Sequence, residues 1–281
     1  MDSFLLFWQH LPEKLRPELF QIGSFQVRYY SLMYLLAFFL TYVLVMYRVE
    51  KEHYPFSKET IQDLLLWDIF GLIVGARLGY VFFYNFSYYL SHPLEIILPF
   101  QFTDGIQFVG ISGMSYHGGA LGLLLVTFFY CRKKSIPFWK IVELFSPAVP
   151  LGYTFGRIGN FINGELYGRV TTVPWGMYFP LDSLHQLRHP SQLYEAVFEG
   201  LVLFAILWSI RRKSPFDGFL FAAYLFGYGF VRFFIEFFRE PDVQLGLVWG
   251  GIFSMGQVLC LIMMTVGIMI YLFRKPRKSL A

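Results

Sequence analysis

The chain has 281 residues, of which 56% are hydrophobic and 15% charged, and its formal net charge is +4. This composition is typical of a polytopic membrane protein and argues against a water-soluble domain. The small positive charge does not indicate nucleic-acid binding, because the basic residues lie mainly in loops between apolar stretches.

The first 24 residues interleave aromatic side chains with prolines and a few charges. Trp8 and Phe20 lie in this segment with Pro12 and Pro17, which is unlike a continuous apolar helix. We therefore predict that residues 1–24 form an arm that lies at the membrane interface without crossing the bilayer.

Seven apolar stretches follow, each near the ~20 residues that a helix needs to cross a bilayer. We predict spans over residues 27–47, 61–86, 115–130, 138–161, 193–210, 219–238 and 248–273. The fold class is therefore an all-α polytopic membrane protein with about seven transmembrane helices, forming a single integral membrane domain over residues 1–281.

The basic residues predict the orientation of these spans. Fourteen of the 23 Lys and Arg residues fall in the loops after the first, third and fifth spans and in the C-terminal tail. The positive-inside rule makes that side cytoplasmic, with the N-terminus outside and the C-terminus inside. Residues 162–192 would then form a small periplasmic head, and their three prolines favour an irregular or β-containing structure.

An unusual polar motif, GRIGNFINGELYG, occupies residues 156–168 beside the fourth span. Arg157, Asn160 and Asn163 follow at steps of three, so their polar ends should gather on one side of a helix. An Arg near the bilayer centre costs about 2.5–3.5 kcal/mol on insertion scales, so it usually marks a functional site. The alternative is a polar seam between helices. A narrow strip for close helix contact recurs every four residues, at Gly152, Gly156, Asn160 and Gly164.

Nine basic residues lie outside the cytoplasmic set, and eight of them are arginines. Arginine is suited to bidentate contacts with phosphate or carboxylate, so an anionic partner is expected. The protein's own carboxylates or ordinary lipid headgroups are the alternative partners. In the sixth span, Arg232, Glu236 and Arg239 share one helix face. Two arginines and one glutamate give this face a net charge of +1, which favours a bound anion.

The second span contains Gly71, Gly75 and Gly79, which predict a close-packed seam against another helix. Arg77 lies near the outer half of this span. It is nine residues from Asp68, which places the two side chains about half a turn apart around the helix. We therefore expect no direct pair between them. For Asp68 we favour a structural hydrogen bond.

Three further residues have both a structural and a functional interpretation. His117 is flanked by glycines that would let backbone approach a ligand closely, and an imidazole can act as a general base near neutral pH. Glu195, in the motif RHPSQLYE, could stabilise a helix N-terminus or take part in catalysis. Tyr30 opens the first span, where interfacial tyrosines are common.

These motifs together resemble the prolipoprotein diacylglyceryl transferases. The stretch GRIGNFINGELYG is similar to the signature of that family, and SGMSYHGG, GARLGY, RHPSQLYE and RFFIEFFREPD occur in the family's order. The resemblance covers nearly the whole chain. It implies a seven-span bacterial inner-membrane enzyme that moves the diacylglyceryl group of phosphatidylglycerol to the lipobox cysteine thiol of a prolipoprotein signal peptide. A thioether forms and glycerol phosphate leaves.

By motif position, the resemblance also implies site residues. The predicted catalytic residues are Tyr30, His117, Arg157 and Arg232. The predicted substrate-binding residues are Arg77, Asn160, Asn163, Glu165, Gly168, Glu236 and Arg239. Besides the two substrates we expect contact with membrane lipids, a monomer, and no nucleic-acid partner, cofactor or metal.

Two rival enzyme classes and one non-enzymatic class were weighed against this interpretation. A CDP-alcohol phosphotransferase needs clustered aspartates, and the aspartates here are scattered; a zinc protease would need an HExxH motif, which the sequence lacks. A transporter or receptor for an anionic solute could use the arginines as a binding site, although broken inverted repeats are not apparent.

Overall fold

The computed structural model is mainly helical and describes residues 3–22, 25–98, 100–101, 107–108, 113–240, 247–248 and 253–274. The chain divides into two compact units, one of residues 1–54 and 142–281 and one of residues 55–141. The predicted single membrane domain stays a prediction.

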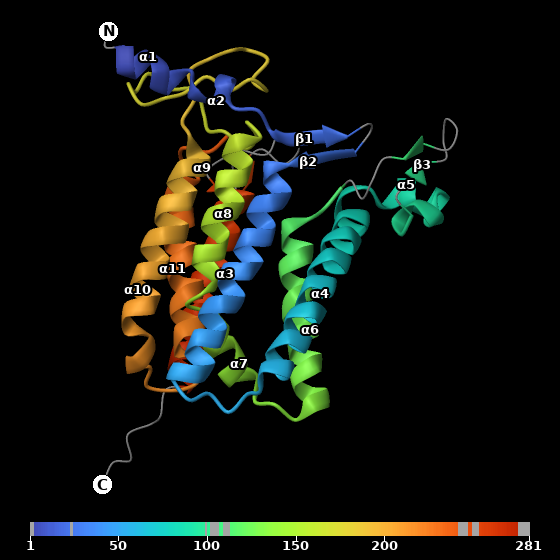
Figure 1. The fold of residues 1–281 in the computed structure, drawn as a ribbon, viewed down its shortest axis with the longest axis vertical. Helices are drawn as coiled ribbons and strands as arrows, with labels where there is room; N and C mark the ends of the chain where they lie inside the picture. Colours follow the sequence, from blue (N-terminus) through green and yellow to red (C-terminus); the bar gives the residue numbers. More distant parts are fainter. Residues whose placement is uncertain are drawn as a thin grey trace. The chain divides into compact units, whose positions relative to one another are not determined.

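The larger unit begins with the short helices α1 (Ser3–Gln9) and α2 (Leu11–Lys14) and an antiparallel hairpin of β1 (Glu18–Ile22) and β2 (Phe25–Arg28). Its bundle contains α3 (Tyr29–Lys51) and α8 (Val149–Ile162). The rest of the unit comprises α9 (Ser191–Tyr194), η2 (Glu195–Val202), α10 (Leu203–Ile210), η3 (Arg211–Lys213), α11 (Phe219–Ile235), β5 (Leu247–Val248), β6 (Phe253–Ser254) and α12 (Met255–Arg274). Within this unit α8 packs between α3 and the α9–η2–α10 segment, and α11 packs on α12 (Figure 1).

The smaller unit is organised around α4 (Lys58–Tyr84) and α6 (Tyr116–Lys134), which lie side by side in Figure 1. Between them come α5 (Phe86–Ser91), the 3-10 turn η1 (Pro93–Ile96) and the two-residue strands β3 (Phe100–Gln101) and β4 (Gln107–Phe108). The side chains of Ser57 and Ser115 start the two long helices, because each hydroxyl accepts a backbone N–H of the first turn. The boundary between the units falls within α7 (Phe138–Phe145).

The predicted glycine seam of α4 is confirmed. A Cβ atom on Gly75 would lie 2.7 Å from the Cα of Gly122, and one on Gly79 would lie 2.7 Å from the Cα of Gly118. The backbones of α4 and α6 therefore touch, which only glycine on both sides permits. The glycines after His117 take part in this packing, because Gly118 packs on α4 and Gly119 meets Ala76; their predicted approach to a ligand stays a prediction.

Membrane-spanning character is clear, but the predicted number of spans is not established by helix length alone. Among the described residues, four helical runs are long and apolar enough to cross a bilayer: Tyr29–Lys51, Lys58–Tyr84, Ser191–Lys213 and Met255–Arg274. Helix α11 is apolar but has only 17 residues. The protein is thus an integral membrane protein with at least these candidate spans.

The predicted fourth span, residues 138–161, is wrong as a single helix. Helix α7 ends at Phe145 and α8 begins at Val149. Pro147 lacks an N–H and disfavours helical geometry in the residue before it, whereas Pro150 fits the first turn of the new helix. The break makes α8 a helix of 14 residues that carries most of the polar motif.

The strip predicted on this motif is only partly correct. Gly152 packs on Ala37 of α3, and Gly156 faces the Tyr34 ring. Gly159, which the strip omitted, meets Tyr30 and Met33 of the same helix. Gly164 does not belong to the strip, because α8 ends at Ile162 and Gly164 adopts a φ of 70° in the turn beyond it.

Residues 163–190, which the structure describes throughout, connect α8 to α9 without a helix. Single antiparallel bridges join Val170 and Met177 to Arg188. The N-terminal arm packs on this segment: the indole of Trp8 donates to the Trp175 carbonyl at 3.0 Å, and the Gln9 side chain donates to the Pro174 carbonyl at 3.0 Å.

Candidate functional site

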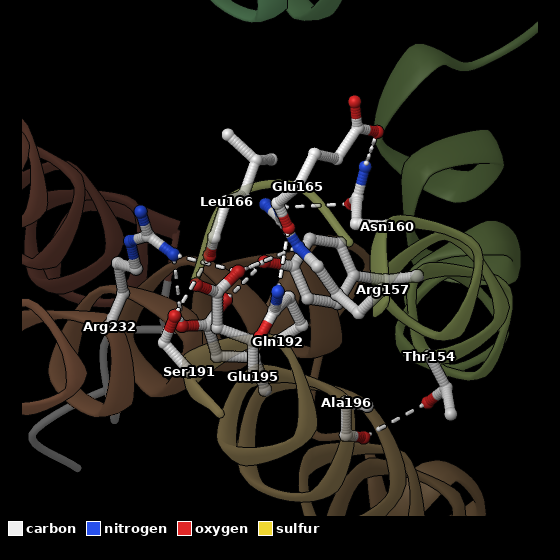
Figure 2. A network of polar contacts seen from close by, with 12 residues as sticks. Thr154, Arg157, Asn160, Glu165, Leu166, Ser191, Gln192, Glu195, Ala196 and Arg232 are labelled. Carbon is white, nitrogen blue, oxygen red and sulfur yellow. Dashed lines mark hydrogen bonds and ion pairs between the residues drawn. The ribbon is translucent and has the colours of Figure 1, made fainter. Parts of the chain in front are cut away.

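Two of the predicted catalytic residues, Arg157 and Arg232, contact the same carboxylate. Arg157 comes from α8 and Arg232 from α11, and Glu195 lies between them at the start of η2 (Figure 2). The Nε of Arg157 is 2.7 Å from Oε2 of Glu195, and Nη1 of Arg232 is 3.1 Å from the same oxygen. The Glu195 side chain is fully buried. Three elements that are far apart in the sequence are thus joined by one atom.

A second carboxylate follows one helical turn later. Oε1 of Glu199 lies 3.6 Å from Nη1 of Arg232, and its Oε2 accepts the Tyr153 hydroxyl at 2.5 Å. That hydroxyl is also 3.3 Å from Oε2 of Glu195. The Arg157 guanidinium lies over the Tyr153 ring, 4.7 Å from its centroid, so the aromatic face also supports the cation.

A third carboxylate reaches Arg232 from its own helix. Oε2 of Glu236 is 3.2 Å from Nη2 of Arg232, one turn away, and its Oε1 accepts the Ser254 hydroxyl at 3.0 Å. Gly256 leaves room for this carboxylate, because a Cβ atom there would lie 2.7 Å from Oε1 of Glu236. We call Arg157, Arg232, Glu195, Glu199 and Glu236 the arginine–carboxylate cluster.

The cluster corrects the charge count made from the sequence. The sequence pattern sets Arg232 and Arg239 against Glu236 alone, but Glu195 and Glu199 come from a separate helix and contact Arg232. The arginine–carboxylate cluster itself contains two arginines and three glutamates, so the predicted surplus of positive charge beside Arg232 is wrong. Arg157 and Arg232 are held by the protein's own carboxylates, which is the alternative given above.

Helix η2 is wound as a π-helix over Glu195–Val202 and packs against α8. A Cβ atom on Gly200 would overlap the Thr154 hydroxyl and lie 3.0 Å from the Thr154 Cβ. The same hydroxyl is 3.3 Å from the Ala196 carbonyl (Figure 2), which places the two helices at hydrogen-bonding distance. Single π turns are frequent at functional sites because they re-aim side chains.

The turn after α8 continues the polar motif into a fixed loop. Arg157 donates to Oδ1 of Asn160 at 3.3 Å, and the Asn160 amide donates to Oε1 of Glu165 at 2.8 Å. The Asn163 amide is 3.5 Å from the same Glu165 oxygen. The polar ends of Arg157, Asn160 and Asn163 thus gather on one side, as predicted. Gln192 anchors the loop by donating to the Glu165 carbonyl at 2.6 Å.

Gly168 occupies a position where backbones cross. Its N–H donates to the His189 carbonyl at 2.8 Å, and it is bridged to Arg239. A Cβ atom on Gly168 would overlap the Phe238 carbonyl and lie 2.8 Å from the His189 Cβ. Gly168 and the Arg239 backbone therefore join the loop after α8 to the chain after α11.

Tyr30 lies in the first turn of α3, where its hydroxyl donates to the Tyr34 hydroxyl at 3.1 Å. Its ring packs against α8, 3.3 Å from where a Cβ atom on Gly159 would lie. Among the residues predicted for catalysis, Tyr30 is thus adjacent to the helix of Arg157.

Two predicted site residues belong to the smaller unit. Arg77 donates to the carbonyls of Glu95, at 2.5 Å, and Ile96, at 3.0 Å, and its guanidinium lies over the Tyr89 ring. These contacts hold the η1 turn on α4. His117 lies in the first turn of α6, and its side chain is outside the described part of the structure. Asp68 accepts the Thr127 hydroxyl at 2.7 Å, which confirms the predicted structural hydrogen bond.

The segment between α8 and α9 has its own buried ion pair. Arg188 contacts Asp182 through two bonds, of 2.8 and 2.9 Å, and Glu240 at 3.2 Å. The hydrogen bonds from Arg188 hold the pKa of the Asp182 carboxyl below its ordinary value. Burial lowers the pKa of the neighbouring His189, which favours its neutral form.

Sequence reasoning missed several members of the site. Glu195 was weighed mainly as a helix-terminal residue, and Glu199, Tyr153 and Gln192 were not considered. The available signal was the spacing of Glu195 and Glu199, four residues apart inside an apolar span, because two such carboxylates on one helix face require cationic partners. Among the described residues, no group of three or more His, Cys, Asp or Glu side chains could hold a metal ion.

Comparison with known proteins matches this chain over almost its full length. The family profile described as prolipoprotein diacylglyceryl transferase matches residues 17–273. A phosphatidylglycerol–prolipoprotein diacylglyceryl transferase of Chlorobaculum tepidum is 52% identical over 278 residues, covering 99% of this chain and 96% of the relative. The proteins of the same name from Wolinella succinogenes and Bordetella avium are each 44% identical, covering 96% and 94% of this chain and 98% and 96% of those relatives. This chain, with its arginine–carboxylate cluster, therefore belongs to the prolipoprotein diacylglyceryl transferase family.

Proposed function

We propose that the protein transfers the diacylglyceryl group of phosphatidylglycerol to the lipobox cysteine of prolipoproteins, the first step of lipoprotein maturation. Family membership supports the reaction. One observation assigns the reaction to particular residues: Arg157 and Arg232 both contact the same buried oxygen of Glu195. Two guanidinium groups held this close can grip one phosphate from two sides.

The reaction is a displacement at carbon. The thiol sulfur attacks the glyceryl carbon, the bond from that carbon to the phosphate oxygen breaks, and glycerol phosphate leaves with the electron pair. The nucleophile comes from the prolipoprotein, so no cysteine of this chain is needed. Cys131 and Cys260 are both free and buried.

The arginines can serve the phosphate while keeping their carboxylate partners. A guanidinium has five N–H donors. Within the described part of the chain, Arg157 contacts Glu195 and Asn160, and Arg232 contacts Glu195, Glu199 and Glu236. Each arginine therefore retains donors for the charge that develops on the leaving oxygen, where a fixed donor is most effective.

Magnitudes favour charge stabilisation over base catalysis. A thiol with a pKa of about 8.5 is a few per cent ionised at pH 7, so complete deprotonation gains about thirty-fold, on the order of 2 kcal/mol. One fixed donor to a developing oxyanion contributes ~2.7–4 kcal/mol. We therefore assign the larger part of the rate to Arg157 and Arg232, and assign His117 to taking the thiol proton, directly or through Tyr30.

The remaining predicted residues bind the headgroup. Asn160, Asn163 and Glu165 form one hydrogen-bonded set beside Arg157, where amide and carboxylate groups can orient glycerol hydroxyls. Glu236 sets the geometry of Arg232. Gly168 and Arg239 lie where the two loops meet. Arg77, which also holds the η1 turn in the smaller unit, is kept in this set as a predicted substrate-binding residue.

The proposed setting is the bacterial inner membrane, with seven spans, an outer N-terminus, a cytoplasmic C-terminus and the active site toward the periplasm. The distribution of basic residues supports this orientation. Phosphatidylglycerol and the prolipoprotein are the substrates, and we expect the protein to act as a monomer.

The test is turnover by the purified protein with headgroup-labelled phosphatidylglycerol and a lipobox peptide. We expect release of labelled glycerol phosphate together with a thioether on the peptide. Arg157→Lys and Arg232→Lys keep the positive charge but remove the planar guanidinium that can donate two parallel hydrogen bonds. Each substitution should lower kcat by about 100-fold or more. His117→Gln should lose about thirty-fold. A transporter or receptor would bind the lipid without releasing glycerol phosphate, and near-normal turnover of Arg232→Lys would contradict the assigned roles.

A further inference from the structure

Glu195 is the only described side chain through which both proposed phosphate-binding arginines are joined. A single oxygen, Oε2, lies 2.7 Å from Nε of Arg157 and 3.1 Å from Nη1 of Arg232. The two arginines come from α8 and α11, so without this atom their separation would depend on two long and flexible side chains.

The position of Glu195 is itself fixed. Its side chain is fully buried, it begins the π-helical η2, and the Tyr153 hydroxyl from α8 is 3.3 Å from the same Oε2. A carboxylate buried in a membrane helix is costly unless it is paired, and a buried pair is weak grounds for stability alone. The geometry therefore favours a role that depends on the length of the Glu195 side chain, because that length places its carboxylate between the two arginines.

We propose that Glu195 is a positioning residue, which sets the distance and orientation of the Arg157 and Arg232 guanidinium groups for the leaving phosphate. The inference rests on the proposed function, because it needs the two arginines to act on phosphate. Glu195 does not touch the substrate and transfers no proton in this role. Its effect is to hold two donors where the negative charge develops, which lowers the barrier more than it strengthens substrate binding.

Glu199 provides a matched comparison on the same helix. It lies one turn beyond Glu195, and its side chain is also fully buried. It contacts Arg232 at 3.6 Å and the Tyr153 hydroxyl, whereas the Arg157 contact belongs to Glu195. The two glutamates thus share burial and charge but differ in whether they bridge the arginines.

The experiment compares Glu195→Gln, Glu195→Asp, Glu199→Gln and Glu199→Asp in the full-length protein. The Gln variants keep the length of the side chain and lose its charge, and the Asp variants keep the charge and lose one methylene of reach. Thermal unfolding in detergent, kcat and KM are measured for each. We expect both Glu195 variants to lose about 100-fold in kcat, similar to the loss of a fixed donor, with KM changed by less than about three-fold.

The Glu199 variants should lose about ten-fold or less in kcat, because they alter a 3.6 Å contact to Arg232 and the bond from the Tyr153 hydroxyl but leave the bridge between the two arginines in place. In the Arg232→Lys background, Glu195→Asp should add less than about three-fold, since both changes remove the same alignment. Near-normal turnover of Glu195→Asp would overturn the inference, because charge neutralisation alone would then be enough. Equal losses at positions 195 and 199 would also overturn it, as would unfolding of both Glu195 variants while the Glu199 variants fold. Absence of glycerol phosphate release by the unaltered protein would instead contradict the proposed function.

Discussion

At the scale of single residues, ion pairs between buried arginines and carboxylates fix the positions of the side chains in the candidate site. Arg232 meets Glu195, Glu199 and Glu236, and Arg188 meets Asp182 and Glu240. Guanidinium suits both places because its planar fork can satisfy several oxygens at once. The first set lies in the helical bundle, and the second joins the loop between α8 and α9 to the chain after α11.

Gly168 should not tolerate a side chain. In Gly168→Ala the new methyl group would overlap the Phe238 carbonyl, and neither backbone can move without breaking the bridge to Arg239. We expect a loss of about 1–3 kcal/mol in the free energy of unfolding, with lower activity. The matched control is Gly156→Ala in the same motif, because its nearest contact would be the Tyr34 ring at 3.9 Å. Equal unfolding temperatures for the two variants would contradict this account.

The Asp182–Arg188 pair predicts a dependence of stability on pH. Because the Asp182 pKa is lower in the folded protein than in the unfolded chain, the pair contributes stability above the unfolded value of about 3.9. That contribution is lost as the pH falls through the lower, folded value. Thermal unfolding between pH 6 and pH 3 should therefore show a steeper decline for the unaltered protein than for Asp182→Asn.

Asp182→Asn should also be less stable at neutral pH, by on the order of 3 kcal/mol, because within the described part of the chain it leaves Arg188 with the half-exposed Glu240 as its one charged partner. Hydrogen exchange of residues 182–188 would locate the effect. Parallel pH profiles for the two proteins would exclude Asp182 as the titrating group.

At the scale of elements, helix ends and helix winding carry the features that sequence patterns missed. The break between α7 and α8 follows from Pro147, and its signal was present in the sequence. The π-helical winding of η2 had no such signal, because EAVFEGLV contains no proline and its winding reflects packing against α8. The start of helix α11 is another feature that the pattern missed, because it is capped by a carboxylate from another helix.

Glu143 of α7 stabilises the start of α11. Its Oε2 accepts the backbone N–H groups of Gly218 and Leu220, at 3.0 and 2.8 Å, and its side chain is nearly inaccessible. Glu143→Ala should cost about 2 kcal/mol or more in the free energy of unfolding, because two buried donors lose their acceptor. Glu50→Ala, at an exposed position on α3, should change it by less than about 0.5 kcal/mol. Melting in detergent measures both, and similar values would rule out this capping role.

At the scale of the whole molecule, the sequence predicted the class of structure better than its internal contacts. Apolar length located α3 and α4 to within a few residues, because the bilayer imposes that length on any spanning helix. It located the end of α12, but that helix begins at Met255 and not at 248, after the strands β5 and β6. Residue spacing along α8 also predicted that Arg157, Asn160 and Asn163 would gather. The pairing of Arg157 and Arg232 with Glu195 could not be predicted in this way, because it depends on how three helices pack together.

The proposed orientation can be tested with cysteines placed on exposed positions of the larger unit. Leu184 and Arg212 are both exposed, and the native Cys131 and Cys260 are buried, so labelling by an impermeant maleimide should report the introduced residue. In intact spheroplasts we expect Leu184→Cys to react and Arg212→Cys to react only after permeabilisation. Reaction of both before permeabilisation would contradict the orientation.

The fit of Gly200 against Thr154 has a consequence for how this protein can change over time. With the Thr154 hydroxyl where a methyl group on residue 200 would lie, residue 200 cannot be enlarged alone without moving η2, and with it Glu195. Enlargement at 200 would first require a smaller residue at 154. Lineages with a larger residue at 200 should therefore carry a smaller residue at 154, acquired first.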